Sequence, residues 1–221
     1  YSWDFGDGSS AGGADPAHQY AAPGSYTATV TASNACGQDT AATTVIVEAP
    51  IAGLAAANNG PSPLASATQF QAIISGGSNV SYSWDFGDGS SAGGADPAHQ
   101  YAAPGSYTAT VTARNAIGQE TAATTVLVEA PIAGLAEANN GTSLLGSATQ
   151  FQATIAGGSN VSYSWDFGDG KSATGAVVDH QYAAPGSYTA AVTASNAVGQ
   201  EIAVTDVNIE EALHSILMPM L

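Results

Sequence analysis

The octapeptide Tyr-Ser-Trp-Asp-Phe-Gly-Asp-Gly occupies residues 82–89 and occurs again at residues 1–8 and 163–170. Successive copies start 81 residues apart both times, so the chain is a tandem array of one unit. Residues 1–49 and 82–130 differ at only 4 of 49 positions. Such near identity indicates duplication within a longer repeat protein, and an enzyme active site that is used once is not usually built in this way.

Large apolar side chains alternate with small polar ones on both sides of this motif. In residues 80–86 the aromatic side chains fall on one face and the serines on the other, which is the pattern of a half-buried strand. The same alternation occurs in residues 68–74 and 107–113, and a Val/Thr-rich run covers 124–128. Glycine-rich and Asn-Gly turns separate these runs. Six or seven short strands in about 80 residues predict a β-sandwich.

The repeat boundaries follow from a proline after Glu-Ala, which stands at residues 48–50 and 129–131. Proline interrupts a sheet ladder and fixes the direction of a linker. We therefore expect complete repeats at 50–130 and 131–211. Residues 1–49 are then the C-terminal part of an earlier repeat, which lacks the counterparts of the first two strands, and residues 212–221 form an apolar tail.

An ordered set of motifs marks each unit. In the middle copy it comprises the Trp-Asp-Phe-Gly-Asp-Gly segment at 84–89, His-Gln-Tyr at 99–101, Gly-Ser-Tyr-Thr-Ala-Thr-Val at 105–111, and Asn115. This set resembles the polycystic kidney disease (PKD) domain family over essentially all of the chain except its last ten residues. The resemblance implies immunoglobulin-like sandwiches of a bacterial or archaeal surface or secreted protein. It implies no enzyme activity for the module.

The aromatic residues of the motifs are expected to fill the cores. This structural signature comprises Trp3, Phe5, Tyr26, Trp84, Phe86, Tyr101, Tyr107, Trp165, Phe167, Tyr182 and Tyr188. The single Cys36 is replaced by Ile117 and Val198 in the next two repeats. We therefore expect Cys36 to pack as a small hydrophobic side chain.

The charge of the chain excludes several classes of partner. Only 2 basic residues accompany 18 acidic ones, for a net charge of -16, which repels phosphate backbones and anionic membrane surfaces. No apolar run reaches the ~20 residues that a membrane helix needs. We therefore expect neither nucleic-acid binding nor membrane insertion. Charged residues make up only 9% of the chain, so its surface is mostly neutral and polar, which suits an extracellular or cell-surface location.

Two kinds of side chain in each repeat could carry chemistry. The paired carboxylates of the Gly turn, Asp85 with Asp88 and Asp166 with Asp169, either cap the turn or contribute to a weak calcium site. Calcium needs six or more ligands, and only two or three carboxylates are close in sequence. His18, His99 and His180 precede Gln-Tyr at the same repeat position, without a catalytic nucleophile motif. We expect them to form structural hydrogen bonds, and we predict no catalytic residue and no other cofactor.

Three N-glycosylation sequons begin at Asn79, Asn140 and Asn160. Each lies at an expected loop or strand start where a glycan would be tolerated. Chance also produces such triplets in a chain rich in Asn, Ser and Thr, so both interpretations stay open.

The leading hypothesis is a non-enzymatic extracellular structural or adhesive repeat protein that forms a stalk, filament or array. Its partners would be further copies or neighbouring repeats, or an extracellular carbohydrate or matrix. The apolar tail at 212–221 could add as a strand to the incomplete first sandwich of a neighbour; alternatively, Tyr1 is an arbitrary edge of a longer protein. A different class of function is a spacer or substrate-binding accessory of a secreted hydrolase.

Overall fold

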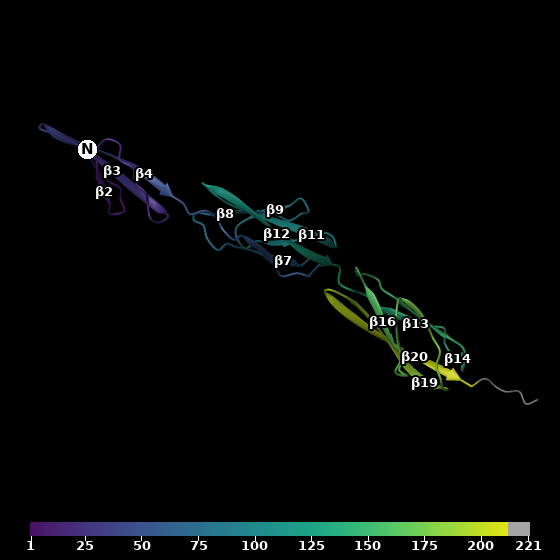
Figure 1. Cartoon of the computed structure of the whole chain (residues 1–221). Helices are drawn as coiled ribbons and strands as arrows, with labels where there is room; N and C mark the ends of the chain where they lie inside the picture. Colours follow the sequence, from purple (N-terminus) through teal and green to yellow (C-terminus); the bar gives the residue numbers. More distant parts are fainter. Residues whose placement is uncertain (212–221) are drawn as a thin grey trace, which may run out of the picture. The chain divides into compact units, whose positions relative to one another are not determined.

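The computed structural model describes residues 1–211, and every regular element among them is a β-strand (Figure 1). The all-β prediction is therefore confirmed. No helix in this described part of the chain is long and apolar enough to cross a membrane. The proposed strand-adding tail at 212–221 lies outside the described residues. The strands are β1 (Ser2–Asp4), β2 (Ser10–Gly12), β3 (Gly24–Asn34), β4 (Gly37–Val47), β5 (Ala55–Asn58), β6 (Ser62–Pro63), β7 (Ala67–Ile73), β8 (Ser81–Asp85), β9 (Ser91–Gly93), β10 (Ala98–Gln100), β11 (Gly105–Asn115), β12 (Gly118–Glu129), β13 (Ala136–Asn139), β14 (Ser143–Leu144), β15 (Thr149–Thr154), β16 (Ser162–Asp166), β17 (Ser172–Thr174), β18 (Val177–His180), β19 (Gly186–Asn196) and β20 (Gly199–Glu210).

Backbone hydrogen bonds join the strands into sheets of three to five strands. The orders are β2-β1-β3-β4, β10-β7-β5, β6-β12-β11-β8-β9, β13-β15-β18 and β14-β20-β19-β16-β17. The chain divides into two compact units. The first contains residues 1–58, 69–99 and 108–125, and the second contains residues 59–68, 100–107 and 126 onward.

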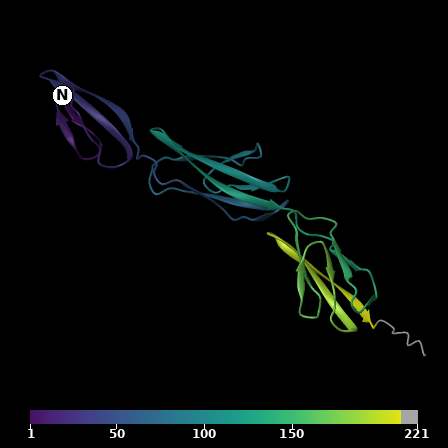
Figure 2. The same cartoon turned by 45° about the vertical axis from the view of Figure 1, so that its right-hand side comes forward.

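The third repeat, within the second unit, is a complete sandwich of a three-stranded and a five-stranded sheet. Its longest element is the antiparallel hairpin of β19 and β20, paired from Gly186 opposite Ile209 to Asn196 opposite Gly199. These strands run side by side in both views, in yellow-green at the C-terminal end of the coloured chain (Figures 1 and 2). The repeat has more strands than the predicted six or seven, because β14 and β17 are too short for an alternating pattern to reveal them.

The core of this sandwich is built from the alternating side chains that the sequence pattern indicates. Trp165 and Phe167 point inward from β16 and the segment after it, with exposures of 0% and 1%. Phe151 of β15 and Val192 of β19 pack in the same cluster. Fully burying a large apolar side chain contributes roughly 1.5–3 kcal/mol. The buried apolar faces of its two sheets therefore stabilise this sandwich.

Residues 1–49, in the first unit, form the single four-stranded sheet β2-β1-β3-β4. Their long hairpin has the same form as that of the third repeat, with β3 and β4 paired from Gly24 opposite Val47 to Asn34 opposite Gly37. The sequence interpretation expected two strands to be missing here. In the middle repeat the corresponding residues form three strands, β5, β6 and β7, because the two-residue β6 adds to β12 in parallel.

Cys36 does not pack as predicted. It is an exposed free thiol in the turn between β3 and β4. Ile117, at the same position one repeat later, is 57% exposed. The prediction is wrong because the hairpin turn exposes Cys36 and Ile117, while Val198 at the same position is half-buried, so the position does not require a buried hydrophobic side chain.

Candidate functional site

The most regular polar feature of the chain is the Asp-Phe-Gly-Asp-Gly turn that follows the tryptophan strand. In the middle repeat, the Gly87 amide donates to Asp85 Oδ1 at 2.9 Å, and the Ser90 amide donates to Asp88 Oδ1 at 3.0 Å. Gly87 has φ of +78°, and a Cβ there would lie 2.5 Å from the Thr108 carbonyl oxygen. The first glycine is therefore required both by backbone conformation and by the closeness of the next strand.

The second aspartate of each turn pairs with the repeated histidine. The Nε2-to-Oδ2 distances are 2.8, 2.7 and 2.9 Å for the pairs His18–Asp7, His99–Asp88 and His180–Asp169. In the third repeat, His180 ends β18 of the three-stranded sheet, and Asp169 follows β16 of the five-stranded sheet. The pair therefore joins the two sheets of that sandwich, as expected for a histidine that hydrogen bonds within the scaffold.

Aromatic packing fixes the histidine ring in this pair. His180 stacks on Phe167 with ring centroids 4.0 Å apart and planes 2° apart. The Tyr182 hydroxyl donates to the Phe167 carbonyl at 3.0 Å, and its ring stacks on Tyr188 at 4.2 Å. In the first repeat, His18 stacks on Phe5 at 4.1 Å. The histidine is thus held between an aromatic ring and a carboxylate.

These contacts shift the pKa of the carboxyl groups. Hydrogen bonds from the hydroxyl and amide of Ser9 lower the pKa of Asp7 to about 2. Burial raises the pKa of Asp88, but hydrogen bonds from Ser90 and His99 outweigh burial and lower it to about 2. Burial opposes the shift at Asp169 too, while His180 lowers its pKa. Burial, with a smaller effect of Asp169, raises the pKa of Tyr182 to about 12.

The arrangement does not activate a nucleophile. The Ser90 hydroxyl lies 3.1 Å from His99 Nε2, but it donates to Asp88, and the same histidine nitrogen faces Asp88 Oδ2. The third repeat has Lys171 in the place of this serine. Its histidine and aspartate still pair. The serine is therefore an accessory to the turn, and the repeated part of the cluster is the Asp–His–Phe set.

The calcium candidates are engaged in these turns. Asp85 and Asp166 each accept an amide hydrogen bond at 2.9 Å, and Asp88 and Asp169 each use both carboxylate oxygens. Within residues 1–211 no group of three or more His, Cys, Asp and Glu side chains could hold a metal ion. These hydrogen bonds are those of the turn-capping interpretation, and calcium binding stays a prediction.

The signature aromatic side chains differ in exposure between the first repeat and the two later ones. Trp84, Phe86, Trp165 and Phe167 are at most 1% exposed, and Tyr101 and Tyr182 are 2% exposed. Tyr107 and Tyr188 are half-buried, with hydroxyls that donate to the carbonyls of Ala103 and Ala184. Phe5 is 6% exposed, whereas Trp3 and Tyr26 are half-buried. The first repeat therefore covers its aromatic residues less well.

The three sequon asparagines lie in different surroundings. Asn140 is exposed, its Oδ1 accepts the Gln150 amide at 3.2 Å, and its Nδ2 makes no hydrogen bond within residues 1–211. Asn79 Nδ2 and Asn160 Nδ2 instead donate to glutamates, at 3.3 Å to Glu48 and 2.9 Å to Glu129. The sequons are thus equivalent in sequence but not in structure.

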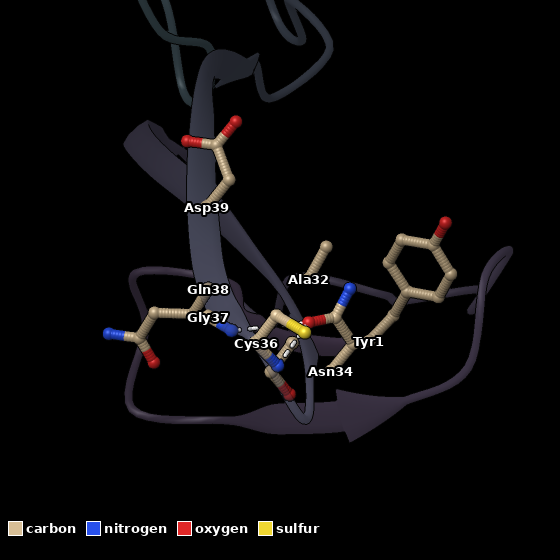
Figure 3. A pocket seen from close by; sticks show the side chains of 8 residues that line it. Tyr1, Ala32, Asn34, Cys36, Gly37, Gln38 and Asp39 are labelled. Atoms are coloured by element: carbon tan, nitrogen blue, oxygen red, sulfur yellow. Dashed lines mark hydrogen bonds between the residues drawn. The ribbon is translucent and has the colours of Figure 1, made fainter.

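An open surface hollow lies beside the turn between β3 and β4 (Figure 3). Asn34 Oδ1 accepts the amides of Cys36 at 2.8 Å and Gly37 at 3.1 Å, drawn as dashed lines there. The lining side chains labelled in the view also include Tyr1 and Asp39. Asn34 therefore serves this turn as Asn115 and Asn196 serve the corresponding turns of the later repeats.

Sequence reasoning missed two sets of contacts. It treated Asp88 and His99 separately, although their 11-residue separation recurs in all three repeats as a paired signal. It also used Glu48 and Glu129 only as boundary markers, while the structure places their carboxylates in hydrogen bonds with the following repeat. Repetition of a polar residue at a constant position is the signal that could have identified both sets.

Comparison with family models identifies these repeats. Models described as PKD domain match residues 53–128 and 136–209, and a second PKD domain model matches residues 1–49. Human polycystin-1 is 30% identical over 207 residues, which cover 90% of this chain and 5% of that protein. The chain thus spans about a twentieth of the length of this relative.

Solved structures are also similar. The PKD domain from the human VPS10 domain-containing receptor SorCS2 is 26% identical, with 41% of this chain and 85% of that chain covered and a TM-score of 0.34. An E-to-A mutated variant of titin domains I67–I69 is 18% identical, with 96% of this chain and 87% of that chain covered and a TM-score of 0.50. The similarity to titin concerns the fold alone, which is that of tandem immunoglobulin-like β-sandwiches.

Proposed function

Because the chain belongs to the PKD domain family, we propose that it is a non-enzymatic structural or adhesive segment of an extracellular or cell-surface protein. Tandem PKD and immunoglobulin-like repeats fit extracellular structural and adhesive modules. The finer form of the proposal is that these repeats make up a surface stalk, filament or array.

The observation that carries the proposal is that the repeated polar side chains form hydrogen bonds within the scaffold. The Asp–His pair, the turn aspartates and the buried tyrosine hydroxyl all form scaffold hydrogen bonds, and the pair occurs in every repeat. A catalytic site is normally formed once and faces a pocket with a substrate. Groups that are repeated and already engaged in the scaffold favour an architectural role.

The surface of the described residues gives less support to a carbohydrate-binding accessory. Such modules usually present exposed aromatic rings to a polysaccharide. Within residues 1–211, Tyr1 is the one aromatic side chain among the large hydrophobic residues that are mostly exposed, at 68%. The remaining exposed ones are aliphatic, such as Ile202 and Val204 on β20. Protein partners, including further copies of the repeat, therefore fit this surface better than a polysaccharide.

Immunogold electron microscopy of native cells, with antibodies against this chain, tests the proposed location and role. We expect label on extended structures outside the cell. Label confined to the cytoplasm would overturn the proposal. Label that follows a soluble secreted hydrolase, together with pull-down of the pure chain on chitin, cellulose or collagen, would establish the accessory role in its place.

Head-to-tail assembly is tested separately. Sedimentation velocity of the full chain over a range of concentrations, alongside a chain that ends at residue 211, reports self-association. Oligomers that require residues 212–221 would support strand addition by the tail. A full chain that stays monomeric at every concentration would overturn head-to-tail assembly while leaving the structural role intact.

A further inference from the structure

The segments that end one repeat and begin the next are Glu48-Ala49-Pro50 and Glu129-Ala130-Pro131. Neither is a free linker, because its backbone is hydrogen bonded to residues of the repeat that follows. The Ala49 amide donates to Ser78 Oγ at 2.8 Å, and the Ala130 amide donates to Ser159 Oγ at 2.9 Å. The same contacts thus occur at both junctions, one within each compact unit.

An asparagine of the following repeat uses its whole amide group at the first junction. Asn115 is 8% exposed, and its Nδ2 donates to the carbonyls of Ala49 at 2.9 Å and Ser78 at 3.1 Å. Its Oδ1 accepts the amides of Ile117 at 3.3 Å and Gly118 at 3.1 Å. Two donors and two acceptors are satisfied at once, which only an amide side chain can do here.

The second junction repeats this arrangement. Asn196 Nδ2 donates to the carbonyls of Ala130 at 2.9 Å and Ser159 at 3.0 Å, and its Oδ1 accepts the amides of Val198 and Gly199. Asn34 occupies the same position in the first repeat and caps the same turn. Its Nδ2 makes no hydrogen bond within residues 1–211, so Asn34 caps the turn without the hydrogen bonds that Asn115 and Asn196 make to a junction segment.

The glutamate that closes each repeat is bound as a carboxylate. Glu129 is 2% exposed, with Oε1 accepting Asn160 Nδ2 at 2.9 Å and Oε2 accepting the Ala197 amide at 2.7 Å. Glu48 makes the corresponding contacts with Asn79 at 3.3 Å and the Ala116 amide at 2.9 Å. None of the ion pairs found within residues 1–211 includes these glutamates. Hydrogen-bond donors alone therefore compensate the loss of water around the carboxylate.

We propose that this end of each repeat is a recognition surface for the Glu-Ala-Pro segment that closes the preceding repeat, so that its partner is a neighbouring copy of the repeat itself. We call the surface of the middle repeat, formed by Asn79, Ser78, Asn115 and the Ala116 amide, and its counterpart in the third repeat, formed by Asn160, Ser159, Asn196 and the Ala197 amide, the linker clamp. The inference rests on the proposed architectural function. In this proposal, consecutive repeats are joined by hydrogen bonds of a glutamate carboxylate and an asparagine amide, and not by an apolar interface.

The clamp explains the composition of the segment. A glutamate supplies two acceptors for an asparagine amide and a backbone amide, and the next residue supplies a carbonyl for Asn115 or Asn196. Proline at the third position has no amide hydrogen that would need a partner. Glu210 stands at the same position at the end of the third repeat, and within the described residues its carboxylate accepts only from Asn208, at 3.5 Å. It serves as an unclamped reference.

Amide hydrogen exchange of the full chain tests the proposal at single residues. The Ala197 amide is bonded to Glu129 and the Ala130 amide to Ser159, so both report closure of the second clamp. We expect Asn196→Asp to speed exchange at both amides at least about tenfold, because a carboxylate oxygen would replace the donor that faces two carbonyls. Glu129→Ala should do the same without touching the repeat core.

Matched controls separate the clamp from the turn. In Asn34→Asp, the side-chain oxygen that caps the turn is kept, and no linker clamp is affected. Glu210→Ala removes a carboxylate that is outside any linker clamp. Both variants should leave exchange at Ala130 and Ala197 unchanged. Tryptophan fluorescence, from Trp3, Trp84 and Trp165 in the three repeats, verifies that each variant is folded. Unchanged exchange in folded Asn196→Asp and Glu129→Ala, or equal effects from Asn34→Asp, would overturn the proposal. Surface labelling of native cells does not depend on these amides, so failure of the clamp and failure of the architectural function are distinguishable.

Discussion

The first and third repeats show what one sequence pattern builds with and without a second sheet. Both form the long hairpin with the same register, β3 with β4 and β19 with β20. Both keep the Asp–His pair, at 2.8 and 2.9 Å. Yet Trp165 is 0% exposed in the complete sandwich, while its counterpart Trp3 is half-buried in the single sheet. The aliphatic residues differ in the same way, since Val192 is 0% exposed and Val30 is half-buried.

This difference separates local from non-local causes. The long hairpin, the glycine turn and the Asp–His pair need only segments that residues 1–49 contain, so they form in either setting. Burial of the aromatic and aliphatic face depends on strands from elsewhere in the repeat. Substitution of a core residue should therefore destabilise the complete sandwich much more than the single sheet. Substitution of a turn residue should destabilise both by similar amounts.

Truncation of the tryptophan should give the largest difference. Trp165→Ala should lower the free energy of unfolding of the third repeat by about 3–5 kcal/mol, because a fully buried ring leaves a cavity. Trp3→Ala should have a much smaller effect, because the ring already contacts solvent. Chemical denaturation of the full-length variants, followed by fluorescence of the remaining tryptophans, measures both. Equal losses would mean that the single sheet is as well packed as the sandwich.

Substitution of the turn glycine should have a smaller effect that is the same in both repeats. A Cβ at Gly168 would lie 2.5 Å from the Thr189 carbonyl oxygen, and one at Gly6 would lie 2.6 Å from that of Thr27, with φ of +77° at both. We expect Gly168→Ala to destabilise the pairing of β16 with β19, and Gly6→Ala the pairing of β1 with β3, by about 1–3 kcal/mol each. Exchange of the amides that join these strands reports each pairing separately. A loss confined to the complete sandwich would contradict the local origin of the turn.

Low pH should weaken the turn of every repeat. The pKa of Asp88 is lowered to about 2 from an ordinary value of 3.8, so the unfolded chain takes up a proton first as pH falls. The contribution of this carboxylate to stability is fully present above about pH 4 and is lost as pH falls through about 2. The pKa of Asp7 is likewise about 2, although its repeat has one sheet. Carboxyl-carbon NMR titration should give both values.

Asp88→Asn removes the charged partner of His99 and should cost about 1 kcal/mol at neutral pH, because the pair is partly open to water. The variant should also flatten the decline in stability of its repeat between pH 4 and 2. An unchanged pH profile in this variant would show that other carboxyl groups cause the acid sensitivity.

N-glycosylation of the three sequons should have the smallest effect on stability. The fraction of chains that carry a glycan should differ clearly between the sites. Asn140 presents an exposed Nδ2, whereas Asn160 Nδ2 faces the buried Glu129. When the folded chain is offered to an N-linking glycosyltransferase, we expect modification at Asn140 and little at Asn79 or Asn160. Peptide mass spectrometry measures the occupancy. Equal modification at all three sites would contradict a closed linker clamp.

The sequence predicted the strands because alternation is visible within a single segment, as in residues 80–86 and β8. It predicted the inward face for the same reason, and Trp84, Phe86 and Val111 are all buried. It could not place Cys36, because a hairpin turn and a buried position both accept a small side chain. It also could not pair Asp169 with His180 across two sheets or join Glu129 to the next repeat, because spatial proximity between distant segments is set by the fold.

Single-molecule force spectroscopy tests whether this chain is a structural segment whose repeats each resist force as a unit. With the chain held at its two ends, we expect two unfolding steps of about 25–30 nm, since each complete repeat releases roughly 80 residues of about 3.3–3.6 Å each. The single sheet of residues 1–49 should release a shorter length at lower force. One step for the whole chain, or extension without resisting steps, would show that the repeats are not separate structural units.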